Sequence, residues 1–222
     1  MKPRSSSRTP LAAIRFTLLI LSLTALPASA QILYEDGPIN GETDAWTINF
    51  GFVVSDTFTI STGNSTVTGM SFGAWLFPGD VLESVEVSFT SEEFGGHTYF
   101  DQVANFTASN CFMNGFGFNV CEETGMFVNG PTLPNGTYWM NLTNAVVNDG
   151  DPVYWDENSG IGCHSPGCPS EPSQNSGGTI AAESFSILGT SSGSGTVPEP
   201  ASLFLFASGV VAAAGALRRK SL

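Results

Sequence analysis

Lysine and arginine are missing from the whole middle of this 222-residue chain. All seven lie in the two end segments, whereas 19 of the 20 acidic residues lie between Gln31 and Val197. This distribution excludes nucleic-acid binding by the middle segment, because phosphate recognition requires a cationic surface. It also disfavours docking on anionic lipid. A surface this acidic instead favours solubility, divalent cations and basic partners.

Histidine is almost as scarce, since His97 and His164 are the only two in the sequence. The scarcity of histidine and lysine excludes most Ser-His-Asp, Cys-His and lysine mechanisms. No catalytic or nucleotide-binding signature occurs in the sequence. Paired carboxylates remain available for glycoside hydrolysis, which needs two acids beside one cleft. We expect a solvated acidic surface and a protein that is not an enzyme. The adjacent acidic pairs are Glu92–Glu93, Glu122–Glu123 and Asp156–Glu157.

The first 30 residues have the three parts of a secretory signal peptide. A basic region leads into the apolar run 16–26, and the small residues at 28–30 suit signal peptidase. The run is short for a membrane-spanning helix and is followed by the helix breaker Pro27. We therefore expect the mature chain to begin near Gln31. A retained N-terminal anchor is the alternative.

The C-terminal end carries a second apolar segment. Residues 189–196 are rich in Gly, Ser and Thr and predict a flexible linker. Residues 201–217 are apolar or small, and as a helix they would span roughly 25 Å, the lower limit for crossing a bilayer. Arg218, Arg219 and Lys220 then form a basic cluster of the stop-transfer type. The pattern predicts a transmembrane helix at 201–217.

The segment just before this predicted helix is Val197, Pro198, Glu199 and Pro200. With the helix and the basic cluster, it resembles the PEP-CTERM sorting signal of Gram-negative bacteria, over about the last 25 residues. The resemblance implies a precursor tethered to the inner membrane, recognition by an exosortase, and transfer to the cell surface or extracellular matrix. Such proteins usually accompany extracellular polysaccharide production. An ordinary single-span anchor behind a proline-rich linker is the alternative.

The passenger, residues 31–188, has the size of one domain with its own core. Its apolar residues come in short runs punctuated by Gly, Asn, Pro and Ser, without a sustained helical period. In the run 81–89, for example, the alternation places Val81, Val85 and Val87 on one face. We predict an all-β domain, a two-sheet β-sandwich with the jelly roll as one form of it.

The passenger contains four cysteines, an even number in an exported chain, which argues for disulfide bonds. We favour Cys111–Cys121 and Cys163–Cys168, because these pairs close the shortest loops. The first pair brackets an aromatic, glycine-rich segment that suits a hairpin. The alternative for the second pair is a metal site formed by Cys163, Cys168 and His164, although the spacing is unlike that of common zinc sites.

The stretch 149–158 is the most distinctive part of the passenger, since it combines carboxylates with turn residues and two aromatics. Hard oxygen ligands at this density suit calcium, and apart from calcium we expect no cofactor. Exposed aromatics beside carboxylates also suit stacking on sugar rings; the alternative is that both aromatics lie in the core. The candidate calcium ligands are Asp149, Asp151, Asp156 and Glu157. The candidate sugar-stacking residues are Tyr154 and Trp155.

These observations predict an exported, surface-sorted and non-catalytic envelope or extracellular-matrix protein. Its expected partners are signal peptidase, an exosortase and extracellular polysaccharide, with membrane contact through residues 201–217 before processing. Two other functions remain open: a carbohydrate-binding module, and a polysaccharide-active hydrolase or lyase.

Overall fold

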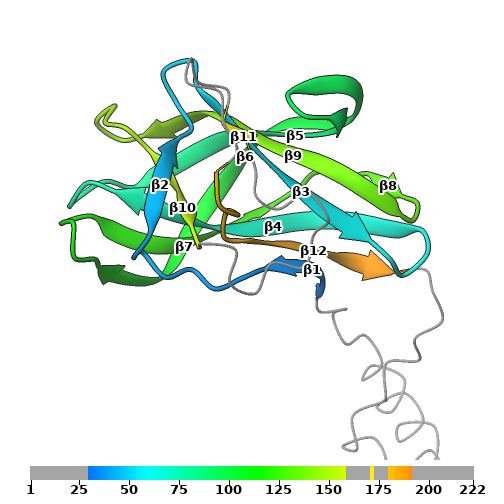
Figure 1. The fold of residues 1–222 in the computed structure, drawn as a ribbon, viewed down its shortest axis with the longest axis horizontal. Helices are drawn as coiled ribbons and strands as arrows, with labels where there is room; N and C mark the ends of the chain where they lie inside the picture. The colour runs from blue at the N-terminus through cyan, green and yellow to red at the C-terminus, as the bar shows by residue number, and fades with distance from the viewer. Residues whose placement is uncertain (1–29, 159–170, 173–179, 192–222) are drawn as a thin grey trace, which may run out of the picture. The chain divides into compact units, whose positions relative to one another are not determined.

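The computed structural model describes residues 30–158, 171–172 and 180–191. Every regular element within these residues is a β-strand, which confirms the all-β prediction. The strands are β1 (Gln31–Asp36), β2 (Asp44–Thr47), β3 (Val53–Ile60), β4 (Ser65–Leu76), β5 (Leu82–Glu92), β6 (Gly95–Met113), β7 (Asn119–Met126), β8 (Thr132–Leu133), β9 (Gly136–Val147), β10 (Tyr154–Glu157), β11 (Glu171–Pro172) and β12 (Phe185–Ser191) (Figure 1).

Strand β5 shows how the sequence pattern produces these elements. Val85 and Val87 are fully buried, while Ser84, Glu86 and Ser88 are only partly buried, because successive side chains of a strand point to opposite faces. Val81, expected on the same face, is instead exposed and precedes the strand. The register against β9 shifts twice between Leu82 and Glu86, and these irregularities break the simple alternation at that end.

The strands form one antiparallel, curled sheet in the order β1-β12-β4-β7-β6-β5-β9-β3-β11. Strand β6 has 19 residues and joins the two halves of the sheet. Its first part, up to Asn105, pairs with β5, and its second part, from Phe106, pairs with β7. Because hydrogen bonding continues along β6, the fold is a half-barrel and not clearly the two-sheet sandwich that we predicted.

The core lies inside the curl, between β3, β9 and β5 on one side and β4 and β12 on the other (Figure 1). Phe58 of β3 is central, with its ring centroid 5.0 Å from that of Phe89 and 6.3 Å from that of Tyr34. The ring centroid of Phe72 of β4 lies 5.2 Å from that of Phe106 of β6. Burial of each such side chain stabilises the fold by about 1.5–3 kcal/mol. These contacts hold the two halves of the curled sheet together.

Strands β12 and β10 share one edge of β4 and meet beside Gly73. The Gly73 N–H donates to the carbonyl oxygen of Ser184 at 3.1 Å. A Cβ atom at Gly73 would lie 2.6 Å from Ser184 Oγ and 2.7 Å from Asp156 Cβ. Glycine is therefore required at this junction, which brings the buried carboxylate of Asp156 against β4.

The last strand is longer than the sequence pattern indicates. Residues 189–191, expected to begin the flexible linker, belong to β12 and pair with Val67, Thr66 and Ser65 of β4. Gly189 allows this pairing, because a Cβ there would collide with the backbone oxygen of Thr66. Backbone hydrogen bonding thus extends the domain into a segment whose composition resembles that of a linker.

Candidate functional site

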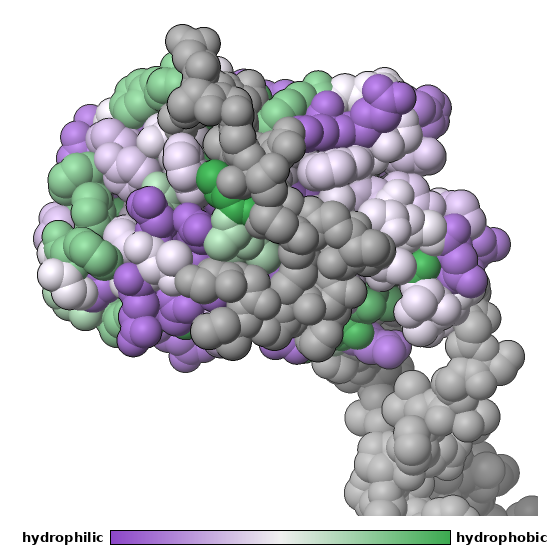
Figure 2. Space-filling model, viewed as in Figure 1, coloured by the Kyte–Doolittle hydropathy of each residue, from purple (hydrophilic) through white to green (hydrophobic). Residues whose placement is uncertain are grey.

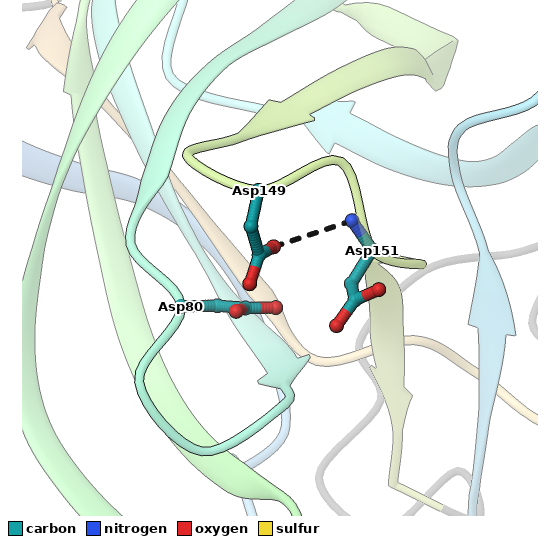
Figure 3. A group of neighbouring side chains, drawn as sticks. All are labelled: Asp80, Asp149 and Asp151. Atoms are coloured by element: carbon teal, nitrogen blue, oxygen red, sulfur yellow. Dashed lines mark hydrogen bonds between the residues drawn. The ribbon is translucent and has the colours of Figure 1, made fainter.

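Three aspartates from two loops converge at one place in the described domain (Figure 3). Asp80 lies in the turn between β4 and β5, and Asp149 and Asp151 lie in the loop between β9 and β10. One carboxylate oxygen of each lies within 4.8 Å of the others. Asp80 is only 7% exposed, whereas Asp149 is exposed and Asp151 is half-buried. We call this group the aspartate cluster.

Two hydrogen bonds between Val81 and Asn148 tie the two loops of the aspartate cluster together. The Val81 N–H donates to Asn148 Oδ1 at 2.7 Å, and the Asn148 N–H donates to the Val81 carbonyl at 3.3 Å. The Asp80 N–H closes its turn on the Phe77 carbonyl at 3.0 Å. The loop between β9 and β10 turns at Gly150, whose φ of 83° is readily adopted by glycine. The loop positions are therefore fixed by bonds that leave the three carboxylates facing one another.

The electrostatics of the aspartate cluster are unfavourable for three ionised groups. Burial, the adjacent Asp149 carboxyl group and the charge of Asp151 raise the pKa of Asp80 to about 6. Asp80 Oδ2 is buried and accepts no hydrogen bond from the described residues. No lysine or arginine occurs between Gln31 and Val197 to balance the charge. A bound proton or a cation must therefore relieve the repulsion.

Asp156, which we predicted as a calcium ligand, lies elsewhere and has a structural role. Its two oxygens accept hydrogen bonds from Trp75 Nε1 (2.6 Å), Ser184 Oγ (3.0 Å) and the backbone N–H groups of Asn40 (3.0 Å) and Gly41 (3.0 Å). Burial raises the pKa of Asp156, and these hydrogen bonds oppose that increase. The carboxylate therefore anchors the loop around Asn40 against β4 and β10.

Glu157 is also engaged outside the aspartate cluster. Its Oε2 accepts a hydrogen bond from Trp46 Nε1 at 3.0 Å, and its Oε1 accepts one from the Ala181 N–H at 3.2 Å. The structure thus corrects the predicted calcium set: Asp149 and Asp151 remain together, Asp156 and Glu157 do not join them, and Asp80 does. The sequence signal that could have identified Asp80 is the turn composition of Pro78, Gly79 and Asp80.

The two aromatics of β10 differ in their surroundings, because adjacent strand residues point to opposite faces. Trp155 is 0% exposed, and its Nε1 donates to the Ser184 carbonyl at 3.0 Å. It belongs to the core, so its predicted role in stacking on a sugar is wrong. Tyr154 is half-buried, with its ring 5.5 Å from that of Phe118.

The predicted disulfide between Cys111 and Cys121 is present. It joins β6 to β7 in the hairpin that we expected, next to a register shift between Ser109 and Phe112. Asn110, inside this irregularity, has a φ of 51°, a left-handed conformation that asparagine tolerates better than most residues. The other predicted pair, Cys163–Cys168, and its neighbour His164 lie outside the described residues.

A groove of about 330 Å³ borders this disulfide. Phe112, which is 40% exposed, lines it together with Asn110, Glu122 and Glu35. Asn110 Nδ2 donates to Glu122 Oε2 at 2.8 Å. The opposite wall includes residues 37–39, just before the loop that Asp156 anchors. We call this feature the Phe112 groove; it combines an exposed ring, two carboxylates and an amide.

Apolar side chains gather along the edge of the domain where the β6–β7 hairpin and the β4–β5 turn lie (left in Figure 2).

A separate group of carboxyls is buried near the junction of β1, β3 and β12. Burial raises the pKa of Asp36 to about 7. Burial, followed by nearby negative charges, raises the pKa of Asp56 and of Glu183 well above the ordinary range. Asp56 Oδ2 accepts a hydrogen bond from the Glu183 N–H at 2.9 Å. Asp56 and Glu183 therefore favour the protonated state at neutral pH, and Asp36 is partly protonated there, which explains how acids occupy a core without bases.

The sequence model of the PEP-CTERM protein-sorting motif matches residues 196–220. The chain carries a PEP-CTERM sorting signal. This motif indicates an exported, surface-sorted protein that is processed by an exosortase from a membrane-anchored precursor. Neither a curated protein nor a solved structure matches the chain.

The sorting elements themselves lie outside the described residues. This applies to the PEP segment, the predicted helix 201–217, the basic cluster 218–220 and residues 1–29 of the predicted signal peptide. Among the residues that are described, no helix has the length and apolar character needed to cross a membrane.

Proposed function

We propose that the chain is a non-catalytic component of the cell surface or extracellular matrix that associates with extracellular polysaccharide. The PEP-CTERM motif at residues 196–220 carries this proposal, because the resemblance links such signals to polysaccharide production. The placement of one adjacent acidic pair supports the non-catalytic part, whereas Glu35 and Glu122 both line the Phe112 groove and keep a hydrolase as the alternative. Glu122 lines the Phe112 groove while Glu123 is buried, so this adjacent pair does not face one cleft as a glycosidase requires.

Truncation of the tail tests the sorting step in the native host. A chain that ends at Pro200 lacks the apolar segment and the basic cluster, so we expect it to appear unprocessed in the medium. A full chain with the PEP residues Pro198, Glu199 and Pro200 changed to alanine keeps the apolar segment, so it should accumulate in the membrane fraction. Normal surface delivery of both variants would contradict the proposal.

The Phe112 groove favours a second candidate function, that of a carbohydrate-binding module. The apolar face of a sugar ring packs on an aromatic side chain, and its hydroxyl groups bond to carboxylates and amides. Phe112 supplies the ring, while Asn110, Glu122 and Glu35 supply the polar groups. The disulfide joins the strands beside the lining residues Asn110 and Phe112, and Asp156 anchors the loop just after the lining residues 37–39. Both restraints limit the ordering cost of binding. The two carboxylates favour neutral or amine-bearing sugars over uronic acids.

A glycan array probed with the full chain tests this candidate. We expect binding to neutral or amine-bearing glycans, and we expect Phe112→Ala and Glu122→Gln to weaken it at least tenfold. Phe116→Ala is the matched control, because Phe116 is 61% exposed in the same hairpin but does not line the groove. Equal binding by all variants, or no binding at all, would reject the carbohydrate site. Release of reducing ends from a bound glycan would instead favour the hydrolase or lyase.

A further inference from the structure

The aspartate cluster has the composition of a site for a hard cation. Asp80, Asp149 and Asp151 present only oxygen, and the cluster contains no histidine or cysteine, which zinc sites in proteins normally use. Calcium accepts six to eight oxygen ligands from carboxylates, backbone carbonyls and water in flexible geometry. Because Asp149 is exposed, water can complete the shell.

Asp80 is the most deeply buried member of the aspartate cluster. Its side chain is more than nine-tenths buried, and its carboxylate points into the space between Asp149 and Asp151 (Figure 3). Its Oδ2 is shielded from solvent and accepts no hydrogen bond from the described residues. Buried polar atoms nearly always have a partner, so Asp80 requires either a bound cation or a proton shared with the Asp149 carboxyl group beside it.

We propose that Asp80, Asp149 and Asp151 bind one Ca²⁺ ion, which clamps the β4–β5 turn to the β9–β10 loop. These loops lead into β5 and out of β9, which are paired in the sheet. The ion replaces the mutual repulsion of three carboxylates by a shared attraction. It thereby fixes the end of the sheet at which the two loops meet.

The loops around the cluster suit calcium better than magnesium. Gly79 precedes Asp80 with a φ of 104°, and Gly150 separates the other two aspartates. Such turns adapt to the long and variable calcium–oxygen distances, whereas magnesium demands a near-ideal octahedron and loses its water reluctantly. Extracellular calcium modules bind in the range of about 0.1–1 mM, the affinity that we expect for this partly exposed site. The site shares no residue with the Phe112 groove, so it stands or falls independently of the proposed function.

Thermal unfolding of the full chain in mild detergent, first stripped with EDTA, tests the proposal. We expect 5 mM CaCl₂ to raise Tm by about 3–6 °C. MgCl₂ at the same concentration, and NaCl at equal ionic strength, should give less than half of that shift. Asp149→Asn with Asp151→Asn should abolish the calcium response, and in EDTA this variant should melt at or above the wild-type Tm because repulsion is relieved. Asp101→Asn, an exposed acid on β6, is the matched control and should keep the full response.

Titration calorimetry with Ca²⁺ keeps the test decisive if the double variant folds poorly. We expect one ion per wild-type chain, and a much weaker heat for the single variant Asp151→Asn. Equal Tm shifts with all three salts would overturn the proposal and leave a proton shared between Asp80 and Asp149. An undiminished calcium response in the folded double variant would overturn it as well, because the ion would then bind elsewhere.

Discussion

Replacing Glu123 by glutamine removes a single buried carboxyl group. Burial alone accounts for the raised pKa of this group. Glu123 lies on β7 with 1% of its surface exposed, and neither of its carboxyl oxygens bonds to a described residue. Burial raises its pKa from 4.5 to about 7. Glutamine has nearly the same shape but does not ionise. The variant therefore isolates the free energy of ionising an acid in this core.

The raised pKa of Glu123 fixes the sign of the effect. Because the folded-state pKa exceeds the unfolded-state value, the contribution to stability is complete below about pH 4.5 and is lost as the pH rises through about 7. At about 1.4 kcal/mol per pKa unit, the loss between pH 5 and pH 7.5 amounts to about 2 kcal/mol. For a domain of this size, this corresponds to roughly 4–8 °C in Tm.

Urea unfolding of the full chain in detergent and EDTA, at pH 5 and pH 7.5, measures this difference. We expect wild type to lose about 2 kcal/mol more stability than Glu123→Gln over this interval. The comparison uses the change in unfolding free energy between the two pH values, not its absolute value. The reason is that the buried glutamine amide of the variant also lacks hydrogen-bond partners. Glu122→Gln, on the opposite face of the strand, should follow the wild-type profile. Parallel profiles for wild type and Glu123→Gln would refute the reasoning.

Three further changes probe the packing around the Phe112 groove. Replacing both Cys111 and Cys121 by serine should lower the free energy of unfolding in urea by about 2–3 kcal/mol, because the disulfide no longer restricts the entropy of the loop that it closes. In wild type, a Cys111–Cys163 cross-link in non-reducing peptide maps would contradict this pairing. Asp156→Ala should cost about 3–5 kcal/mol, since four buried or part-buried donors lose their acceptor, and an unchanged midpoint would contradict that role. Gly73→Ala should cost about 1–3 kcal/mol through overpacking against Ser184 and Asp156, and wild-type stability would show that the junction can relax.

Local patterns in the sequence were enough to predict some of the strands and one cross-link. The alternation around Val85 predicted β5 because burial on one face imposes a two-residue period. The hairpin that Cys111 and Cys121 bracket was predicted because both cysteines are close in sequence. Strand β6 gave little signal, since most of its residues are exposed and its backbone hydrogen bonds are independent of side-chain type. The sequence therefore did not show that the two layers are continuous through β6 and form a half-barrel.

The sequence predicted only part of the candidate calcium site. Asp149 and Asp151 were identified because they share one turn-rich segment. Asp80 was missed, because only the pairing of β5 with β9 brings its turn beside that segment. Asp156 and Glu157 were wrongly added, because β10 begins at Tyr154 and carries them to other partners. Proximity along the chain therefore predicted contact only as far as the strand boundary.

The most direct test of the central claim, sorting through the PEP-CTERM signal, is mass spectrometry of the protein recovered from the cell surface of its native host. The signal matches residues 196–220, so processing by an exosortase should remove the predicted helix 201–217 and the basic residues after it. We predict that the surface form contains peptides of the β-domain but none from residues 203–217. Recovery of surface protein with an intact C-terminus at Leu222 would contradict the account.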